Sequence, residues 1–235
     1  MLFRSVAKRA IELGNGHVDI LINNAGIYPF GPTHEMTEEQ FDRVFSLNVK
    51  ATYFLVAELA PLMAKRGKGA IVNLSTMAAD YGAPGMSLYG SSKAAINLLT
   101  KTWAAEYGPS GVRVNAVSPG PTRTEGTDAM GEALEQLAAE APAGRPAIAD
   151  EIAEAIVVLA TDRSSFIHGA KLAVDGPHRH LNQPMFSNRR GFTPSGHHTE
   201  MSEFGATRAV RIPRSGFPTI RPCNANRGYE SGGRH

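Results

Sequence analysis

Mostly apolar runs of four to six residues recur along the first 177 positions of the chain. They lie at 18–23, 70–74, 112–117 and 171–174, and none shows the apolar–polar alternation of a half-exposed strand. Runs of this kind are typical of strands that are buried on both faces of a parallel sheet. We therefore expect four buried strands.

Segments with apolar residues at helical spacing separate these runs. They cover 3–11, 91–107 and 149–160, and a capping box that begins at Thr37 predicts a further helix over 37–63. Strands that alternate with helices predict an α/β fold, in which helices cover both faces of a parallel sheet.

The charges are divided unevenly along the chain. Residues 1–177 hold 15 Lys and Arg against 19 Asp and Glu, a net charge of −4, whereas residues 178–235 hold 9 Arg against 3 Glu, a net charge of +6. The near-neutral total of +2 therefore conceals an acidic body followed by a basic tail.

The tail lacks the composition of a packed domain. Only 8 of its 58 residues are Leu, Ile, Val or Phe, below the ~20% at which a packed core becomes improbable. We expect residues 178–235 to be disordered, either as a genuine tail or as an out-of-frame extension. A nucleic-acid-binding arm is disfavoured because the arginines are dispersed instead of clustered.

Several classes of protein are excluded. No apolar run reaches the roughly 18 residues of a membrane span, and no signal peptide follows Met1. Cys223 is the single cysteine, and neither His34 nor His168 has a second ligand at metal-binding spacing. The sequence thus predicts a cytoplasmic protein without a metal site.

A phenol and an ammonium group stand four positions apart at Tyr89 and Lys93, on one face of a helix. A strand that ends in two hydroxyls, Ser75 and Thr76, precedes them. Acid–base work by a phenol at neutral pH requires its pKa of about 10 to fall by about 3 units. A lysine one turn away is a credible source of that effect, although a solvated pair is the alternative.

Polar residues also follow the first and third strands. Asn24, Ala25 and Gly26 close the first, and Pro119 and Gly120 close the third. Open parallel sheets bind ligands at such carboxyl ends. Asn48 lies on the apolar face of its helix and therefore needs a buried partner. A satisfied core amide is the simpler interpretation of Asn48 by itself.

Four motifs together resemble the short-chain dehydrogenase/reductase family over residues 1–176. They are Asn-Asn-Ala-Gly at 23–26, Tyr-Gly-Ser-Ser-Lys at 89–93, Val-Asn-Ala-Val-Ser-Pro-Gly at 114–120 and Val-Asp-Gly at 174–176. The resemblance implies a Rossmann-like doubly wound sheet. It also implies an oxidoreductase that exchanges hydride between NAD or NADP and a small carbonyl or alcohol substrate.

The resemblance assigns roles to individual residues. It implies that Tyr89 is the general acid/base, and that Lys93 lowers its pKa and holds the nicotinamide ribose. Asn48 would order a proton relay through water. The position of the family's catalytic serine is occupied by Thr76, with Ser75 as the fallback. The residues implied to contact the cofactor are Asn24, Ala25, Gly26, Tyr89, Lys93, Pro119, Gly120, Thr122 and Thr124.

Residues 121–147 would form a mobile substrate lid by the same resemblance. The lid is rich in small and acidic residues, and Arg123 and Arg145 are its only cations. This composition mildly disfavours an anionic substrate held by an arginine clamp.

The family's glycine-rich phosphate loop has no counterpart in the sequence. Only 17 residues precede the strand at Val18, whereas one β-α-β unit takes about 30 or more. We therefore expect an incomplete Rossmann-like domain over 1–177 that contains only the later strands. The strand order of the resembling family places the missing strands together at one side of the sheet, which implies that the strand at 19–23 forms a bare apolar edge of a four-stranded sheet.

Two functions remain open at this stage. One is an NAD(P)-dependent oxidoreductase whose activity is doubtful without the phosphate loop. The other is a catalytically silent fragment that acts as an oligomerisation or interaction module. The helices at 50–66 and 91–107 form subunit contacts in the resembling family, which implies a homo-oligomer.

Overall fold

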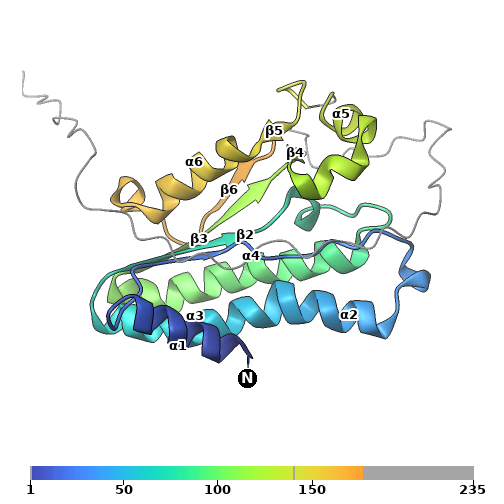
Figure 1. The fold of residues 1–235 in the computed structure, drawn as a ribbon. Coiled ribbons are helices and arrows are strands. Elements are labelled where there is room, and N and C mark those ends of the chain that lie inside the picture. The colour runs from blue at the N-terminus through green and yellow to red at the C-terminus, as the bar shows by residue number, and fades with distance from the viewer. Residues whose placement is uncertain (1, 140, 177–235) are drawn as a thin grey trace, which may run out of the picture.

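Four parallel strands form the central sheet of the computed structural model, which describes residues 2–139 and 141–176 (Figure 1). Their order is β1-β2-β3-β6. The predicted tail at 178–235 lies outside the described residues. The strands are β1 (Ile20–Asn23), β2 (Gly69–Leu74), β3 (Val112–Pro119) and β6 (Lys171–Val174).

The predicted four-stranded sheet is confirmed, and so is the position of its first strand at the edge. Within the described chain, β1 pairs only with β2, in a register that places Ile20 opposite Ala70. The strand is shorter than the predicted 18–23 because Val18 and Asp19 precede the ladder.

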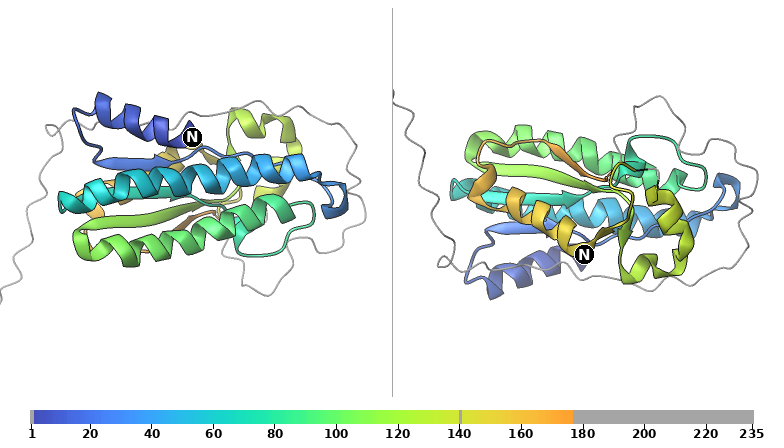
Figure 2. Two further views of the ribbon diagram at one scale, coloured as in Figure 1. Left: turned by 90° about the horizontal axis from the view of Figure 1, so that it is seen from below. Right: turned by 90° about the horizontal axis from the view of Figure 1, so that it is seen from above.

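Helices cover both faces of the sheet, as the alternation of elements predicted (Figures 1 and 2). One face carries α1 (Leu2–Leu13), α3 (Thr52–Lys65) and α4 (Ser87–Tyr107), and the other carries α6 (Ala149–Ala160). Leu59 and Met63 of α3 pack against Ile71 of β2, all almost fully buried. On the opposite face, Val72 and Val117 pack against Leu159 of α6. The central strands are therefore buried on both sides, which explains their continuous apolar runs.

The helix predicted over 37–63 forms one continuous helical segment, which we call the rod, and a π-helical stretch interrupts its middle. It consists of α2 (Glu38–Phe45), the π-helical segment η2 (Ser46–Ala51) and α3. The predicted capping box is present, because Thr37 Oγ1 accepts from the Gln40 amide at 3.1 Å and Gln40 Oε1 accepts from the Thr37 amide at 2.9 Å. Apolar periodicity predicted the rod but not the π-helix.

The helix α4 begins at Ser87, four residues before the predicted start at Ser91. Its first turn is stabilised by Leu88, which is buried against Ile27 and Val44 from other elements. Local periodicity cannot show such a contact. As a consequence, Tyr89 lies inside α4, and the packing of Leu88 against Ile27 and Val44 fixes the position of this part of the helix.

The segment after β3 forms a small layer beyond the end of the sheet (Figure 1). The two-residue strands β4 (Thr122–Arg123) and β5 (Ala147–Ile148) pair in parallel. The helix α5 (Glu132–Ala139) lies between them in the sequence. This is the segment predicted to be a lid. Short 3-10 turns complete the described chain: η1 (Thr33–Glu35), η3 (Met77–Ala79), η4 (Gly108–Ser110), η5 (Glu125–Met130) and η6 (Asp162–Ser164).

None of the helices in the described part of the chain is both long enough and apolar enough to cross a membrane.

Candidate active site

The candidate residues gather where β1, β2 and β3 end. Because these strands are parallel, their carboxyl ends lie at one edge of the sheet, and the loops that follow them meet there. The loop after β1 carries Gly26, the loop after β2 carries Thr76, and α4 brings Tyr89 and Lys93 to the same edge.

The Thr76 side chain lies beside the Tyr89 phenol, and hydrogen bonding by its hydroxyl lowers the pKa of Tyr89. Thr76 is held in place because its Oγ1 also accepts from the Ala78 amide at 3.3 Å, which caps the short turn η3. Ser75, the alternative, points elsewhere: its Oγ is buried and has no hydrogen-bond partner within the described chain. The geometry therefore favours Thr76 over Ser75 as the hydroxyl that acts with Tyr89.

Burial raises the pKa of Tyr89 to about 12, against a partial lowering by the hydrogen bond from Thr76. The neighbouring phenol of Tyr28 adds a smaller upward effect. Burial is the largest of these effects and outweighs the lowering by Thr76. At neutral pH the phenol therefore carries its proton and can donate it.

Lys93 is a fully buried ammonium group one helical turn after Tyr89. Its Nζ donates to the Leu74 carbonyl oxygen at the end of β2, at 2.7 Å. Burial lowers its pKa to about 8, and no charged neighbour contributes to this shift. A buried cation without a compensating carboxylate is costly, and such groups concentrate at functional sites.

Asn48 lies in the π-helix and is 1% exposed. Its side chain pairs with both backbone groups of Ile27: Oδ1 accepts from the amide at 2.9 Å, and Nδ2 donates to the carbonyl at 2.9 Å. Nδ2 also donates to Ser92 Oγ at 3.0 Å. The predicted buried partner is thus confirmed. Asn48 ties the loop after β1 to the helix that carries Tyr89 and Lys93.

Gly26 allows these groups to approach one another. A Cβ atom at this position would lie 3.2 Å from Lys93 Nζ and 3.3 Å from Asn48 Oδ1, tighter than ordinary contact. Of its two neighbours among the predicted cofactor contacts, Ala25 is half-buried and Asn24 is exposed.

The predicted residues after β3 line the adjoining part of the edge. Pro119 and Gly120 are half-buried, and a Cβ at Gly120 would lie 2.3 Å from the Asp175 carbonyl oxygen, so only glycine fits there. Thr122 Oγ1 donates to the Gly120 carbonyl at 2.9 Å. Thr124 is exposed and caps η5. These four residues support the loop and the lid, and they make no hydrogen bond to the Thr76–Tyr89 pair.

Tyr28 was not identified from the sequence, although it contacts the reactive group. Its ring centroid lies 5.8 Å from that of Tyr89, with the rings tilted by 60°. Its hydroxyl donates to the Gly126 carbonyl in the lid, and burial raises its pKa. Its position two residues after the Asn-Asn-Ala-Gly motif was the one feature of the sequence that could have marked it as a residue of the site.

A metal centre is not formed by the described part of the chain, where no three His, Cys, Asp or Glu side chains are grouped as ligands. His34 and His168 are both exposed.

The chain is similar to several known oxidoreductases. A family model described as Enoyl-(Acyl carrier protein) reductase matches residues 3–177. A 3-oxoacyl-(acyl-carrier-protein) reductase of Thermotoga maritima is 39% identical over 162 residues, covering 68% of this chain and 66% of the relative. A 3alpha-hydroxysteroid dehydrogenase of Mediterraneibacter gnavus is 42% identical over 165 residues, covering 70% of this chain and 66% of the relative.

Solved structures show the same similarity. A gluconate 5-dehydrogenase from Burkholderia cenocepacia, crystallised with NADP and tartrate, is 30% identical with a TM-score of 0.70, covering 74% of this chain and 69% of that one. This chain thus spans about two thirds of the length of the curated relatives that it matches.

Proposed function

This chain belongs to the short-chain dehydrogenase/reductase family, and from that premise we propose that it transfers hydride between NAD or NADP and a carbonyl or alcohol substrate. The observation that supports this most strongly is the placement of Thr76 beside Tyr89, whose pKa its hydroxyl lowers, with the buried Lys93 ammonium one helical turn away. A proton donor, a second hydroxyl and a cation at the carboxyl edge of a parallel sheet are the groups that carbonyl reduction requires.

The side chains at this edge fit the nicotinamide end of such a cofactor. The Lys93 ammonium is buried without a charged neighbour that affects its pKa, and it can bind ribose hydroxyls. Gly26 keeps the backbone beside it free of a side chain. Pro119 and Gly120, at the end of β3, would lie along the same ligand. When bound, the nicotinamide supplies or accepts the hydride.

The protein's part in the reduction is to handle the proton. Thr76 Oγ1 donates a hydrogen bond to the carbonyl oxygen of the substrate and orients it towards Tyr89. Tyr89 Oη then gives its proton to that oxygen as negative charge develops there. The Lys93 ammonium stabilises the resulting phenolate. Asn48 is held by Ile27 and Ser92, and it keeps the loop after β1 aligned with α4. We propose that Asn48 also orders the water through which the proton is relayed.

Cofactor affinity is expected to be low for the 235-residue chain. The sequence contains no Thr-Gly-x-x-x-Gly-x-Gly motif, and such loops hold the cofactor pyrophosphate through backbone amides at a helix N-terminus. The residues described above hold only the nicotinamide side, so activity should be weak.

A titration with NADH and NADPH tests the proposal. Energy transfer from Trp103 to the reduced nicotinamide, or a thermal shift, should appear at concentrations approaching about 1 mM. Tyr89→Phe should leave this binding unchanged and reduce carbonyl turnover by about 10²-fold or more. Tyr53→Phe, on the outer surface, is the matched control and should retain full turnover. Absence of both signals with either nucleotide would overturn the activity of this chain.

We also propose that the protein forms a homo-oligomer through the outer faces of α3 and α4. Tyr53 on α3 is 46% exposed and Leu98 on α4 is 67% exposed. The ring centroid of Tyr53 lies 6.0 Å from that of Trp103, which joins the two helices into one surface. A cavity of about 520 Å³ beside it is lined by Asp42, Phe45, Ser46, Val49, Lys50, Tyr53 and Phe54. Large apolar side chains grouped on a surface mark a protein contact.

A further inference from the structure

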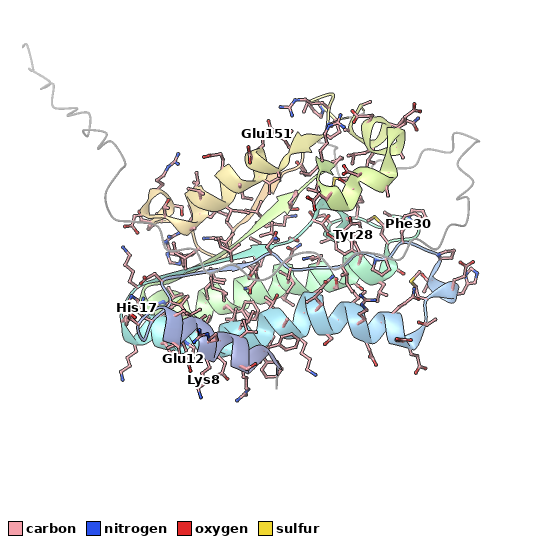
Figure 3. All side chains as sticks on the ribbon, viewed as in Figure 1. Lys8, Glu12, His17, Tyr28, Phe30 and Glu151 are labelled. Atoms are coloured by element: carbon pink, nitrogen blue, oxygen red, sulfur yellow. The ribbon has the colours of Figure 1, made fainter. Side chains whose placement is uncertain are left out.

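Two aromatic side chains of the loop after β1 have no part in the proton transfer proposed above, and one of them adjoins the reactive phenol. Tyr28 lies with its ring centroid 5.8 Å from that of Tyr89. Phe30, two residues later, is 55% exposed. Figure 3 shows both on the segment between β1 and α2, at the end of the molecule below α5. Exposed aromatic surface beside a buried reactive group is a feature of ligand pockets.

Backbone contacts fix the position of Phe30. The Gly31 amide donates to the Gly85 carbonyl at 3.0 Å, which joins the loop after β1 to the loop that leads into α4. A Cβ at Gly85 would lie 2.6 Å from Phe30 Cζ, and Gly85 has a φ of +80°. The ring of Phe30 therefore rests on bare backbone, close in sequence to the start of the helix that carries Tyr89.

Tyr28 connects the reactive group to the lid. Its hydroxyl donates to the Gly126 carbonyl, and a Cβ at Gly126 would lie only 2.6 Å from that hydroxyl. The lid thus touches the tip of Tyr28 while the ring touches Tyr89. The ring of Tyr28 is therefore one surface that a substrate can contact when its oxygen reaches Tyr89.

Both cations of the lid segment are already paired. Arg123 forms an ion pair with Glu135, and Arg145 forms two hydrogen bonds with Glu151, at 2.9 and 2.6 Å. These are the two cations of the lid segment. A carboxylate or phosphate on the substrate would have to break one of these pairs to find a partner there, and it would also face the acidic side chains of the segment.

We propose that Tyr28 and Phe30 form an aromatic wall of the substrate pocket, and that the substrate is an uncharged ketone or secondary alcohol that presents an apolar ring to this wall. The inference rests on the proposed function, because it takes Tyr89 as the group that meets the substrate oxygen. A rigid ring suits an aromatic face better than a flexible chain, since less conformational entropy is lost on binding.

Two ketones with the same ring test the charge preference. 4-Methylcyclohexanone and 4-oxocyclohexanecarboxylate differ only in the group opposite the carbonyl. Affinities for the full chain are measured by saturation-transfer difference NMR, with and without NADPH, and turnover is followed separately. The methyl ketone should bind at least about tenfold more tightly than the carboxylate.

Single substitutions test the wall. Tyr28→Ala and Phe30→Ala should each weaken binding of the methyl ketone by about tenfold. Tyr28→Phe, which keeps the ring and removes only the bond to the lid, should stay within about threefold of the wild type. Phe166→Ala, at a side chain that is 99% exposed on another loop, is the matched control and should change nothing. Because Phe30 is exposed, its substitution can be interpreted even if Tyr28→Ala fails to fold.

The outcomes separate this inference from the proposed function. Equal or better binding of the carboxylate, no binding of either ketone, or unchanged affinity in Tyr28→Ala and Phe30→Ala would overturn the aromatic wall, even if turnover is observed. Binding of the methyl ketone that both alanine variants weaken, without any NADPH binding or turnover, would support the wall and overturn the activity.

Discussion

The two hydroxyls that follow β2 have opposite surroundings although they are adjacent in sequence. Thr76 bonds to Tyr89 and to the Ala78 amide, whereas Ser75 Oγ is buried without a partner in the described chain. An unsatisfied buried hydroxyl contributes no stability and costs desolvation. The residue type alone could not distinguish the two, because the direction of each side chain depends on where β2 ends.

This difference predicts opposite effects of substitution. Thr76→Val removes the hydroxyl at nearly constant volume and should lower turnover by about 10²-fold or more, with little change in cofactor affinity. Ser75→Ala should keep full turnover and should leave the free energy of unfolding unchanged or raised by up to about 1 kcal/mol. Paired kinetic and urea-unfolding measurements check both variants. Loss of turnover in Ser75→Ala with retention in Thr76→Val would reverse the assignment.

Lys93 illustrates a conflict between stability and function. Burial lowers its pKa from the ordinary lysine value of 10.5 to about 8 in the folded protein. Between these values the unfolded chain binds more protons, so stability rises with pH from about 8 to 10.5. Below pH 8 both states are protonated, and the folded state bears the full cost of the buried charge, about 3 kcal/mol.

Lys93→Met should therefore stabilise the protein at pH 7 while it abolishes activity. We expect a gain of about 1–3 kcal/mol, less than the full amount because the bond to Leu74 is lost, and a weaker rise in stability between pH 8 and 10. Urea unfolding at pH 7 and pH 10 measures both effects. Lys101→Met, at an exposed lysine of the same helix, is the control. A variant that is less stable at both pH values would contradict the prediction.

At the scale of elements, the π-helix η2 is the feature that joins the site together. It places Asn48 so that one side chain satisfies both backbone groups of Ile27 and the hydroxyl of Ser92. π-Helical turns inside α-helices are frequent at functional sites. The polar residue on an apolar face predicted a buried partner, but the partner lies on a segment 21 residues away, which no local pattern can identify.

Asn48→Leu should destabilise the protein strongly. The variant leaves the amide and carbonyl of Ile27 buried and unpaired, at an expected cost of about 2–4 kcal/mol. Thr37→Ala, which removes the exposed cap of the same rod, should cost only about 1 kcal/mol. Chemical denaturation of both variants gives the comparison. Equal losses would mean that Asn48 is not a structural link between the loop and α4.

At the scale of the whole molecule, the order β1-β2-β3-β6 brings the loops after β1, β2 and β3 to one edge of the sheet. The same order leaves β1 with one strand partner in the described chain. An edge strand with apolar neighbours favours association between molecules. The outer surface of α3 and α4 offers a second and larger route to association.

Charged substitutions on that second surface should reduce association. Tyr53→Glu combined with Leu98→Glu should shift sedimentation towards the monomer, because burying two unpaired carboxylates in an interface costs several kcal/mol. Phe166→Glu, at the most exposed aromatic side chain of the described chain, should leave the distribution as in the wild type. A monomeric wild-type protein, or equal effects of both substitutions, would refute an interface at α3 and α4.

The sequence by itself predicted the four strands of the central sheet, their parallel arrangement and the main helices, because each segment carries its apolar periodicity within itself. The motifs predicted the family, and the family's strand order implied the edge position of β1. Only the tertiary structure distinguished Thr76 from Ser75, found the partners of Asn48, placed Tyr28 against Tyr89 and showed that burial raises the Tyr89 pKa. Each of these depends on contacts between residues far apart in the chain, where packing and desolvation decide side-chain direction and charge.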